Sequence, residues 1–319
     1  MADSNKNRAE YWKRVNRVVD YIEAHRAEEL SLETLAGVAA FSPYHFHRIF
    51  KAVIGENLRE FIQRVRLESA ASQLVAQPQA EILRVAVDNG FSSASAFARA
   101  FKDRFGMTAS AWRGGGFDEW SKCRQADSKP GEADRKAGKA EPGAPALHPS
   151  GSGDGARRDP EETMSVTVKT LPTHHVAYVR NVGPYGPDGI GPLWQRLKRW
   201  AEARDLWTAD RVCIGIAYDD PRVTEPARCR YDAAIVVPGS FAADGDINVV
   251  DLPGGKFATI DFTGTLDGLG GAWEQMFAWL PDSGFQPDQR PAIELYRGEA
   301  YDPATGRFTF ELCMAVQPL

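Results

Sequence analysis

One short stretch near the end of the chain, IELYRG at 293–298, places a carboxylate two residues before an aromatic hydroxyl. In a β-strand, Glu294 and Tyr296 would share one face, while Ile293 and Leu295 would share the other. A carboxylate beside aromatic rings in an apolar pocket suits a cationic or amphipathic ligand, through charge pairing and cation–π contact. We therefore expect Glu294 and Tyr296 to belong to a ligand-binding site.

A second set of candidate residues lies on two helical patterns in the first third of the chain. In YHFHRIFKAVIG (44–55) and SAFARAFKDRFG (95–106), phenylalanines recur on one face and polar side chains on the other. Each polar face carries an Arg and, three residues later, a Lys. The outward-facing residues are Tyr44, His47, Arg48 and Lys51 in the first helix and Ser95, Arg99 and Lys102 in the second.

Other chemistry has little support in the sequence. There is no nucleophile triad, no phosphate-binding glycine loop and no group of residues at the spacing of metal ligands, so we expect no catalytic residue, metal or cofactor. His45 and His47 fall on different sides of a helix. No stretch approaches the roughly 20 apolar residues of a membrane span, and the polar start lacks a signal peptide. The cysteines lie far apart, which is typical of reduced thiols in a cytoplasmic protein: Cys123, Cys213, Cys229 and Cys313.

Length, composition and charge indicate how these residues are carried. The chain has 319 residues, 43% of them hydrophobic and 25% charged, which predicts about two globular domains. The formal net charge of −5 excludes a protein that coats nucleic acid through bulk charge. Residues 1–120 carry 16 basic and 15 acidic side chains, whereas 163–319 carry 14 and 20. The two ends therefore have different predicted partners.

A segment between these ends has the composition of a linker. From 121 to 162 the chain has no aromatic residue, Val, Ile or Met, and a single Leu, Leu147. Such a segment cannot bury enough apolar surface to offset its ordering entropy. We predict an N-terminal domain at 8–115, a flexible linker at 116–162 and a C-terminal domain at 163–319.

The N-terminal domain is predicted to be all-α and to contain the same unit twice. A short helix after Ser31 is followed by a turn and a helix that begins at Ser42-Pro43. After a long helix from Leu58 to about Gln77, the short helix, turn and second helix recur at 82–106. At about 1.5 Å per residue the long helix spans about 30 Å and would hold the two copies apart by that distance.

The stretch AVDNGFSSASAFARAFKDRFGMTASAWR (86–113) resembles the signature of the AraC/XylS family of transcription regulators. Gly90-Phe91, Phe97, Phe101-Lys102, Phe105-Gly106 and Arg113 match it in order, and the upstream FSPYHFHRIFK resembles the first recognition helix of the family. Ala109 departs from the pattern, since the family usually has Pro there. The resemblance implies a double helix-turn-helix domain that binds double-stranded DNA. By resemblance, base contacts fall on Tyr44, His47 and Arg48 and on Ala94, Ser95 and Arg99, and phosphate contacts on Lys51 and Lys102.

The C-terminal domain repeats a pattern of strand, glycine-rich turn and helix. VKTLPTHHVAYVRNVGPY (168–185) aligns with VVDLPGGKFATIDFTGTL (249–266), and Trp194 and Trp200 then align with Trp273 and Trp279. We predict a pseudo-symmetric, duplicated α+β domain with one antiparallel sheet, and a ligand site between its halves. The candidate liners of that site, besides Glu294 and Tyr296, are Tyr178, Tyr185, Trp194, Tyr218, Tyr231 and Trp273.

This half resembles the GyrI-like small-molecule-binding domain, which is also found attached to AraC-type helix-turn-helix regions in multidrug-sensing regulators. The features that match are HHVAYVRNVGPY, GIAYDDP (215–221), CRYDAAIVV (229–237), LPGGKFATIDFTG (252–264) and the Glu of IELY. By resemblance, Glu294 occupies the position of the acidic residue of the pocket.

Three functions remain open at this stage. The first is a non-enzymatic transcription regulator that binds DNA, a small-molecule effector and RNA polymerase. The second is a hydrolase of strained cyclopropyl natural products, in which Glu294 would act with Tyr185 or Tyr178. The third is a protein-interaction module whose acidic surface contacts another protein. The operator, the effector, the direction of regulation and the oligomeric state do not follow from the sequence.

Overall fold

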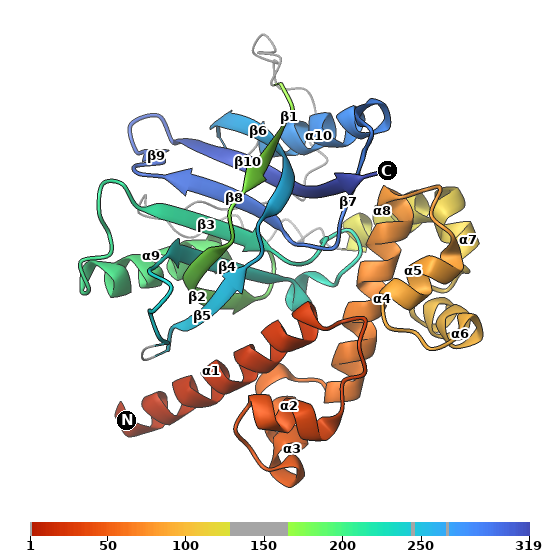
Figure 1. Cartoon of the computed structure of the whole chain (residues 1–319), viewed down its shortest axis with the longest axis horizontal. Coiled ribbons are helices and arrows are strands. Elements are labelled where there is room, and N and C mark those ends of the chain that lie inside the picture. Colours follow the sequence, from red (N-terminus) through yellow and green to blue (C-terminus); the bar gives the residue numbers. More distant parts are fainter. Residues whose placement is uncertain (1, 128–164, 244–245, 266–267) are drawn as a thin grey trace. The chain divides into compact units, whose positions relative to one another are not determined.

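The computed structural model describes residues 2–127, 165–243, 246–265 and 268–319. It divides into two compact units, Met1–Glu119 with Ser240–Val250, and Trp120–Gly239 with Asp251–Leu319. The first is mostly helical, and the second is built on one antiparallel sheet with helices packed against it (Figure 1). This confirms the predicted class, an all-α domain followed by an α+β domain.

The helical unit contains the same pair of helices twice. The short helices α2 and α5 have seven residues each, the longer helices α3 and α6 have twelve, and α4 joins the two pairs. The helices are α1 (Ala2–Ala24), α2 (Leu32–Val38), α3 (Pro43–Ile54), α4 (Leu58–Ala76), α5 (Ile82–Asp88), α6 (Ala94–Phe105) and α7 (Ala109–Ala111), and a π-helical turn (Trp112–Gly116) leads into α8 (Phe117–Asp127).

Local sequence signals account for where these helices begin and end. The side chains of Ser31 and Ser93 accept hydrogen bonds from the backbone at the start of α2 and α6, and Asn57 forms a capping box with Glu60 at the start of α4. Ser42 occupies the cap position of α3 with an extended backbone but without a side-chain hydrogen bond. Gly55 and Gly106 end α3 and α6 in the left-handed conformation that glycine favours.

Each copy of the helix pair has its own aromatic core. In the first copy Phe46, Phe50 and Phe61 are buried and pack edge to face. In the second copy the buried rings are Phe97, Phe101, Phe105 and Trp112, and the Trp112 indole also donates to the carbonyl of Ala71 in α4 at 3.0 Å. These phenylalanines face inward as the sequence predicts, so the polar residues between them face outward.

The segment predicted as a linker is helical at its start. Helix α8 occupies 117–127, and Phe117 packs against Trp112 with 5.4 Å between the ring centroids. This aromatic contact extends the helical region beyond residue 115. The rest of the predicted linker, residues 128–162, lies outside the described residues. Its flexibility and the domain boundaries therefore stay predictions.

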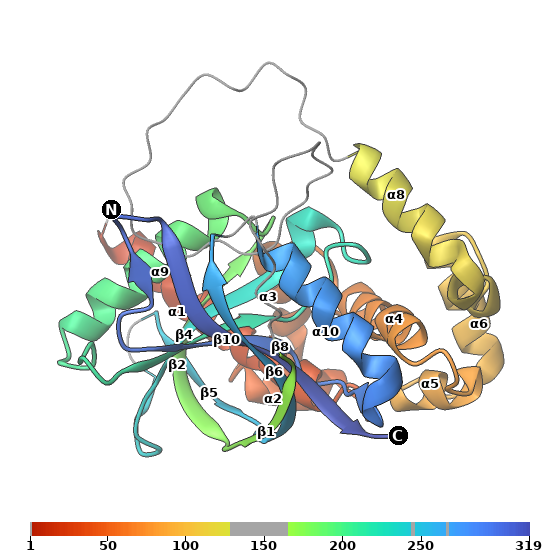
Figure 2. The ribbon, with the colours of Figure 1, turned by 90° about the horizontal axis from the view of Figure 1, so that it is seen from above.

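The second unit is built on strands that occur in two similar sets. The order in the sheet is β1-β6-β10-β8-β3-β4-β2-β5, with β7 and β9 paired to β10, while α9 packs on β2 and β4 and α10 packs on β6 (Figure 2). The elements are β1 (Thr167–Leu171), β2 (His174–Val182), α9 (Pro187–Glu202), β3 (Val212–Ala217), a 3-10 turn (Pro226–Arg228), β4 (Arg230–Val236), β5 (Asn248–Leu252), β6 (Gly255–Gly264), α10 (Leu269–Ser283), β7 (Phe285–Pro287), β8 (Ala292–Arg297), β9 (Tyr301–Asp302) and β10 (Arg307–Pro318).

The strand order makes the predicted duplication visible. If β1, β2, β3 and β4 are exchanged with β5, β6, β8 and β10, the order of the sheet is reproduced in reverse. The two halves therefore have a pseudo-twofold relation, and each supplies its first strand to the other half, because β1 pairs with β6 and β5 pairs with β2. The centre of this symmetry lies between β3 and β8, where Gly215 is paired with Glu294.

Candidate functional site

Helix α3 presents its polar residues to solvent. Because Phe46 and Phe50 are buried, the polar residues His47 and Arg48 between them turn outward. The side chain of Tyr44 is 65% exposed, and the Arg48 guanidinium lies over its ring, 5.3 Å from the centroid. The predicted contact residues of this helix are all exposed: Tyr44, His47, Arg48 and Lys51.

Helix α6 presents an equivalent but smaller polar face. Its N-terminus is held by the Ser93 hydroxyl, which accepts from the backbone of Ala96 at 3.2 Å and lies 3.2 Å from the Ser95 hydroxyl. Short side chains therefore occupy the first turn, and the longer basic residues follow. The predicted contact residues of this helix are also exposed: Ala94, Ser95, Arg99 and Lys102.

The basic groups on these two faces are available for a ligand. Arg48, Lys51, Arg99 and Lys102 form no ion pair with any residue that the structure describes. Other exposed arginines of the same unit do form such pairs, as Arg84 does with Asp88 at 3.7 Å. Two exposed helix faces with unpaired cations are what phosphate and base-edge contacts require.

The second candidate site is a buried carboxylate on β8. Glu294 is only 4% exposed, and its Oε2 accepts hydrogen bonds from the hydroxyls of Tyr296 at 2.9 Å and Tyr231 at 3.3 Å. Burial raises the pKa of Glu294 to about 8, although both hydroxyl hydrogen bonds oppose the rise. No hydrogen bond from the described residues reaches the other oxygen, Oε1.

Gly215 makes room for this arrangement, and its role was missed in the sequence. It lies on β3 directly opposite Glu294, and a Cβ added there would come within 2.1 Å of the Tyr231 hydroxyl and 2.6 Å of Glu294 Oε2. No side chain fits beside these two groups. The signal in the sequence was a glycine inside an otherwise apolar strand, CIGIAY, which is typical of a close approach by a neighbouring group.

Aromatic rings surround the carboxylate on the same face of the sheet. The Trp194 ring from α9 meets the Tyr296 ring edge-on at 5.5 Å, and Tyr296 packs against Phe310 of β10 at 4.9 Å. Trp194 is only 5% exposed. The structure thus gathers Glu294 and Tyr296 of β8, Tyr231 of β4 and Trp194 of α9.

Two predicted members of this site, Tyr178 and Tyr218, lie on the other face of the sheet. Gly215 of β3 is paired with Glu294 of β8 on one side and with Ala233 of β4 on the other, so these three residues share one face of the sheet. The residues that alternate with them along each strand point to the opposite face. There, the Tyr218 hydroxyl donates to Asp232 at 2.9 Å, and Asp232 also binds the Arg180 guanidinium, which lies 5.0 Å from the Tyr178 ring. Both tyrosines belong to a buried ion-pair cluster and not to the surroundings of Glu294.

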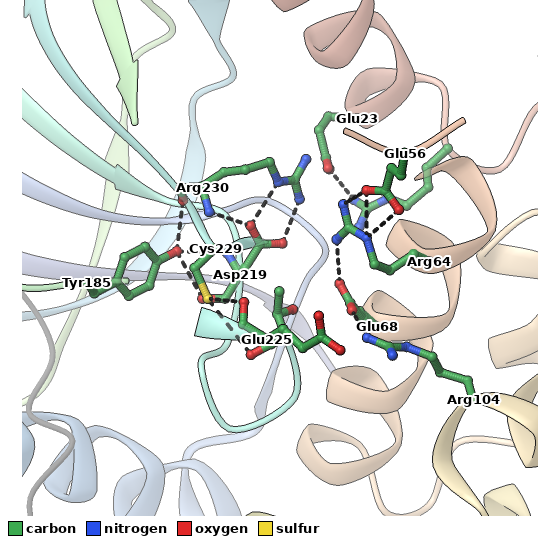
Figure 3. A network of polar contacts seen from close by, with 12 residues as sticks. Glu23, Glu56, Arg64, Glu68, Arg104, Tyr185, Asp219, Glu225, Cys229 and Arg230 are labelled. Atoms are coloured by element: carbon green, nitrogen blue, oxygen red, sulfur yellow. Dashed lines mark hydrogen bonds and ion pairs between the residues drawn. The ribbon is translucent and has the colours of Figure 1, made fainter. Parts of the chain in front are cut away.

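Tyr185 also makes its hydrogen bonds away from the carboxylate. The Tyr185 hydroxyl donates to the backbone carbonyls of Arg230 at 2.8 Å and Asp219 at 3.1 Å, next to the ion pair between those two side chains (Figure 3). Its ring approaches Tyr231 with 6.1 Å between centroids, so Tyr185 backs the site without reaching Glu294. Trp273 of α10 stacks on Phe277 at 6.0 Å.

In the described part of the chain, no group of three or more His, Cys, Asp or Glu could hold a metal ion. No helix among the described residues is long and apolar enough to cross a lipid bilayer.

Comparison with known proteins identifies both halves. Residues 164–317 match the GyrI-like small molecule binding domain, and residues 35–115 match a helix-turn-helix domain. YosT of Bacillus subtilis strain 168, a prophage-derived protein named as a candidate transcriptional regulator, is 32% identical over 139 residues, which are 44% of this chain and 93% of YosT.

Two further matches cover smaller shares. The bifunctional transcriptional activator and DNA repair enzyme AdaA of Bacillus subtilis is 37% identical over 99 residues, 31% of this chain, and the chain spans only 46% of AdaA. An AraC-type DNA-binding domain protein from Chromobacterium violaceum, known as a crystal structure, is 26% identical with a TM-score of 0.30, over 32% of this chain and 91% of that one.

Proposed function

From the premise that this chain belongs to the AraC-type transcription regulators and carries a C-terminal GyrI-like domain, we propose that a small lipophilic cation binds at Glu294. Binding of the cation would control how the chain acts on DNA. The observation that carries the proposal is the buried Glu294 carboxyl, which two tyrosine hydroxyls hold by Oε2 while Oε1 has no partner among the described residues. The chain would do this in the cytoplasm, with RNA polymerase as a further partner.

The chemistry of the site favours a cation over a neutral ligand. A carboxylate loses hydration when it is buried, which is why the pKa of Glu294 is raised to about 8. A cation that enters beside Oε1 would replace the proton, and the faces of Trp194 and Tyr296 would add cation–π attraction and apolar contact. Glu294 would recognise the charge, and the rings of Trp194, Tyr231 and Tyr296 would select for apolar groups around it.

We further propose that α3 and α6 are the two recognition helices and enter successive major grooves. Arg48 and Arg99 would bind base edges, with Tyr44 and His47 beside the first and Ala94 and Ser95 beside the second, while Lys51 and Lys102 would bind phosphates. Unpaired cations on both exposed faces support this assignment. Because Ala94 and Ser95 are short, α6 would read fewer bases than α3.

Binding of tetraphenylphosphonium, a permanently charged lipophilic cation, tests the effector proposal by calorimetry on the full chain. We expect Glu294→Gln to weaken binding at least tenfold, because the new amide carries no charge. Triphenylphosphine oxide, which is neutral, should bind both proteins equally weakly. Glu311→Gln is the matched control, since Glu311 lies on the adjacent strand β10 beside Leu295, on the opposite face. Equal affinity of wild type and Glu294→Gln for the cation would refute the proposal.

A second candidate function is hydrolysis of a strained ring at the same carboxyl. The observation in its favour is that a Glu with a pKa of about 8 is protonated at neutral pH and could act as a general acid. The hydroxyls beside it are those of Tyr231 and Tyr296, in place of the expected Tyr185 or Tyr178. Incubation with a cyclopropyl natural product distinguishes the two functions, because an effector is recovered unchanged and a substrate is not.

A further inference from the structure

A chain of buried charged side chains runs through the helical unit. The Arg64 guanidinium of α4 binds Glu56 with both carboxylate oxygens, at 2.6–3.3 Å, and binds Glu68 Oε2 at 3.0 Å. The other oxygen of Glu68 accepts from Arg104 at 2.7 Å (Figure 3). Glu56, Arg64 and Glu68 are at most 8% exposed, so water does little to screen these pairs.

The two ends of this chain lie beside the two helices that carry the candidate DNA contacts. Glu56 directly follows Gly55, the residue that ends α3, and Arg104 lies in the last turn of α6. Between them, Arg64 and Glu68 are one turn apart on α4. The C-terminal ends of α3 and α6 are thus joined through α4 by side chains with fixed hydrogen-bond directions.

Arg66 of α4 forms a second connection between the two copies. Its guanidinium donates to the carbonyls of Arg26 at 2.9 Å and Glu28 at 2.6 Å, in the segment between α1 and α2, and to the carbonyl of Gly90 at 2.9 Å. Gly90 lies in the turn that leads into α6, and a Cβ there would come within 2.7 Å of the guanidinium. One side chain therefore holds backbone from both helix pairs.

The chemical type of these contacts indicates that they fix the relative position of the helices and add little to the stability of the fold. A buried ion pair is often no more stabilising than apolar side chains of the same size, since its charges lose their hydration. A guanidinium does differ from an apolar group in its planar fork of donors, which fixes distance and angle together. A protein that needs only a stable contact between the two helix pairs has no need of this arrangement, whereas one that needs a set spacing does.

We propose that Arg64 and Arg66 are positioning residues that fix the separation and rotation of α3 and α6, and thereby set the spacing of the two half-sites that the chain accepts on DNA. The proposal rests on the proposed function, in which both helices read a major groove. The new element is that residues of α4, which do not touch DNA, determine the spacing of the half-sites.

The test uses duplexes selected from a random pool by the full-length wild-type chain. Affinity is compared for the selected site, the same site with one base pair inserted between its half-sites, and the site with one half-site scrambled. One inserted base pair rotates a half-site by about a tenth of a turn. We expect it to weaken wild-type binding about tenfold or more, and binding by Arg66→Gln or Arg104→Gln less than about threefold.

The choice of variants separates positioning from folding and from charge. Arg104→Gln leaves both pairs of Arg64 in place, so it opens the connection to α6 without leaving Glu68 unpaired. Arg66→Lys keeps the charge but cannot reach three carbonyls, and should behave like Arg66→Gln. Arg59→Gln is the matched control, because Arg59 is exposed on the same helix and has no partner among the described residues. All variants should bind the one-half-site duplex as the wild type does.

Three results would overturn the proposal. If Arg66→Gln and Arg104→Gln keep the wild-type ratio between the selected and the inserted duplex, α4 does not set the spacing. If Arg66→Lys restores that ratio, the charge and not the fork of donors is responsible. If the pool yields a site with a single half-site, or no site, then the proposed function of α3 and α6 fails and the positioning role fails with it.

Discussion

At the scale of single residues, the environment of Glu294 explains its chemistry. The side chain is only 4% exposed and its carboxyl is held by Tyr231 and Tyr296, so its charged form lacks water and its pKa rises to about 8. Burial also raises the pKa values of Tyr231 and Tyr296 well above their ordinary range, so both hydroxyls stay protonated and remain donors. With a pKa of about 8, Glu294 is a neutral carboxylic acid at neutral pH, and a bound cation would convert it to a carboxylate.

This raised pKa predicts a stability that falls with increasing pH. Between its ordinary value of 4.5 and about 8, Glu294 is protonated in the folded chain and ionised in the unfolded chain. The folded state then binds more protons, so the free energy of unfolding falls by up to about 1.4 kcal/mol per pH unit in this window. Denaturant unfolding of wild type and Glu294→Gln at pH 5, 6.5 and 8 measures the difference. The variant should gain relative stability as pH rises, and parallel curves would contradict the assignment.

The residues that we propose to contact DNA make separable predictions. Arg48→Ala should weaken binding to the selected DNA site by about 1–3 kcal/mol and relax base preference at one position, since Arg48 is proposed to bind a base edge. Lys51→Ala should weaken binding to all sequences alike and lower the salt slope by about 1, because a phosphate contact releases a counterion. Fluorescence anisotropy at several salt concentrations measures both. An Arg48→Ala loss that is equal for specific and random DNA would argue against base contact.

At the scale of elements, the two helix pairs differ in the turn before the recognition helix. The first turn has Ala40 in the left-handed conformation at φ 53°, and the second has Gly90 at φ 77°. An arginine donates to the carbonyl at each position: Arg14 to Ala40 at 3.2 Å and Arg66 to Gly90 at 2.9 Å. The two turns thus have the same backbone conformation. Glycine fits it at position 90, whereas alanine at position 40 adopts it with strain.

Exchanging the two residue types should have opposite effects on stability. Ala40→Gly should stabilise the helical unit by about 1 kcal/mol, because a left-handed alanine costs about 1–2 kcal/mol and glycine gives back only part of that in chain entropy. Gly90→Ala should destabilise it by about 2 kcal/mol or more, since the new Cβ would also meet the Arg26 carbonyl at 2.5 Å and the Arg66 guanidinium. Thermal unfolding followed by circular dichroism gives both values, and destabilisation by Ala40→Gly would contradict this account.

The sequence predicted the elements better than the faces they present. Phenylalanine spacing was enough to orient α3 and α6, because a helix face is set by one local period. In the sheet, Glu294 and Tyr296 could be placed together because they lie on one strand. Tyr178 and Tyr218 could not, since their orientation depends on the register between β2, β4 and β3, and a shift of one residue reverses every side chain. The exchange of β1 and β5 between the halves depends in the same way on long-range pairing.

At the scale of the whole molecule, the uneven distribution of charge along the chain can be compared with the proposed partners of its two domains. Residues 1–120 are nearly balanced, so under the proposed function affinity for DNA comes from where the cations on α3 and α6 are placed. Residues 163–319 carry 20 acidic against 14 basic side chains, and a cation approaches such a domain more readily than an anion does. Bulk charge thus favours the proposed cation but not DNA, and a regulator also requires that binding of one changes binding of the other.

That requirement gives a prediction for the intact chain. If the cation and DNA are coupled, each must change the equilibrium affinity of the other by the same factor, which for regulatory proteins is about 5–150-fold. Calorimetry with tetraphenylphosphonium in the presence and absence of the selected DNA gives one factor. Anisotropy of that DNA with and without the cation gives the other, and the two should agree.

The sign of the coupling distinguishes repression from activation at the binding step, and its absence is equally informative. Glu294→Gln, which should not bind the cation, must show wild-type DNA affinity and no response to the cation. A ligand with equal affinity for the free and the DNA-bound chain shifts no population, however tightly it binds. Tight cation binding with both factors near one would therefore exclude control through DNA affinity, and would require that the effector act on a step after the chain has bound its site.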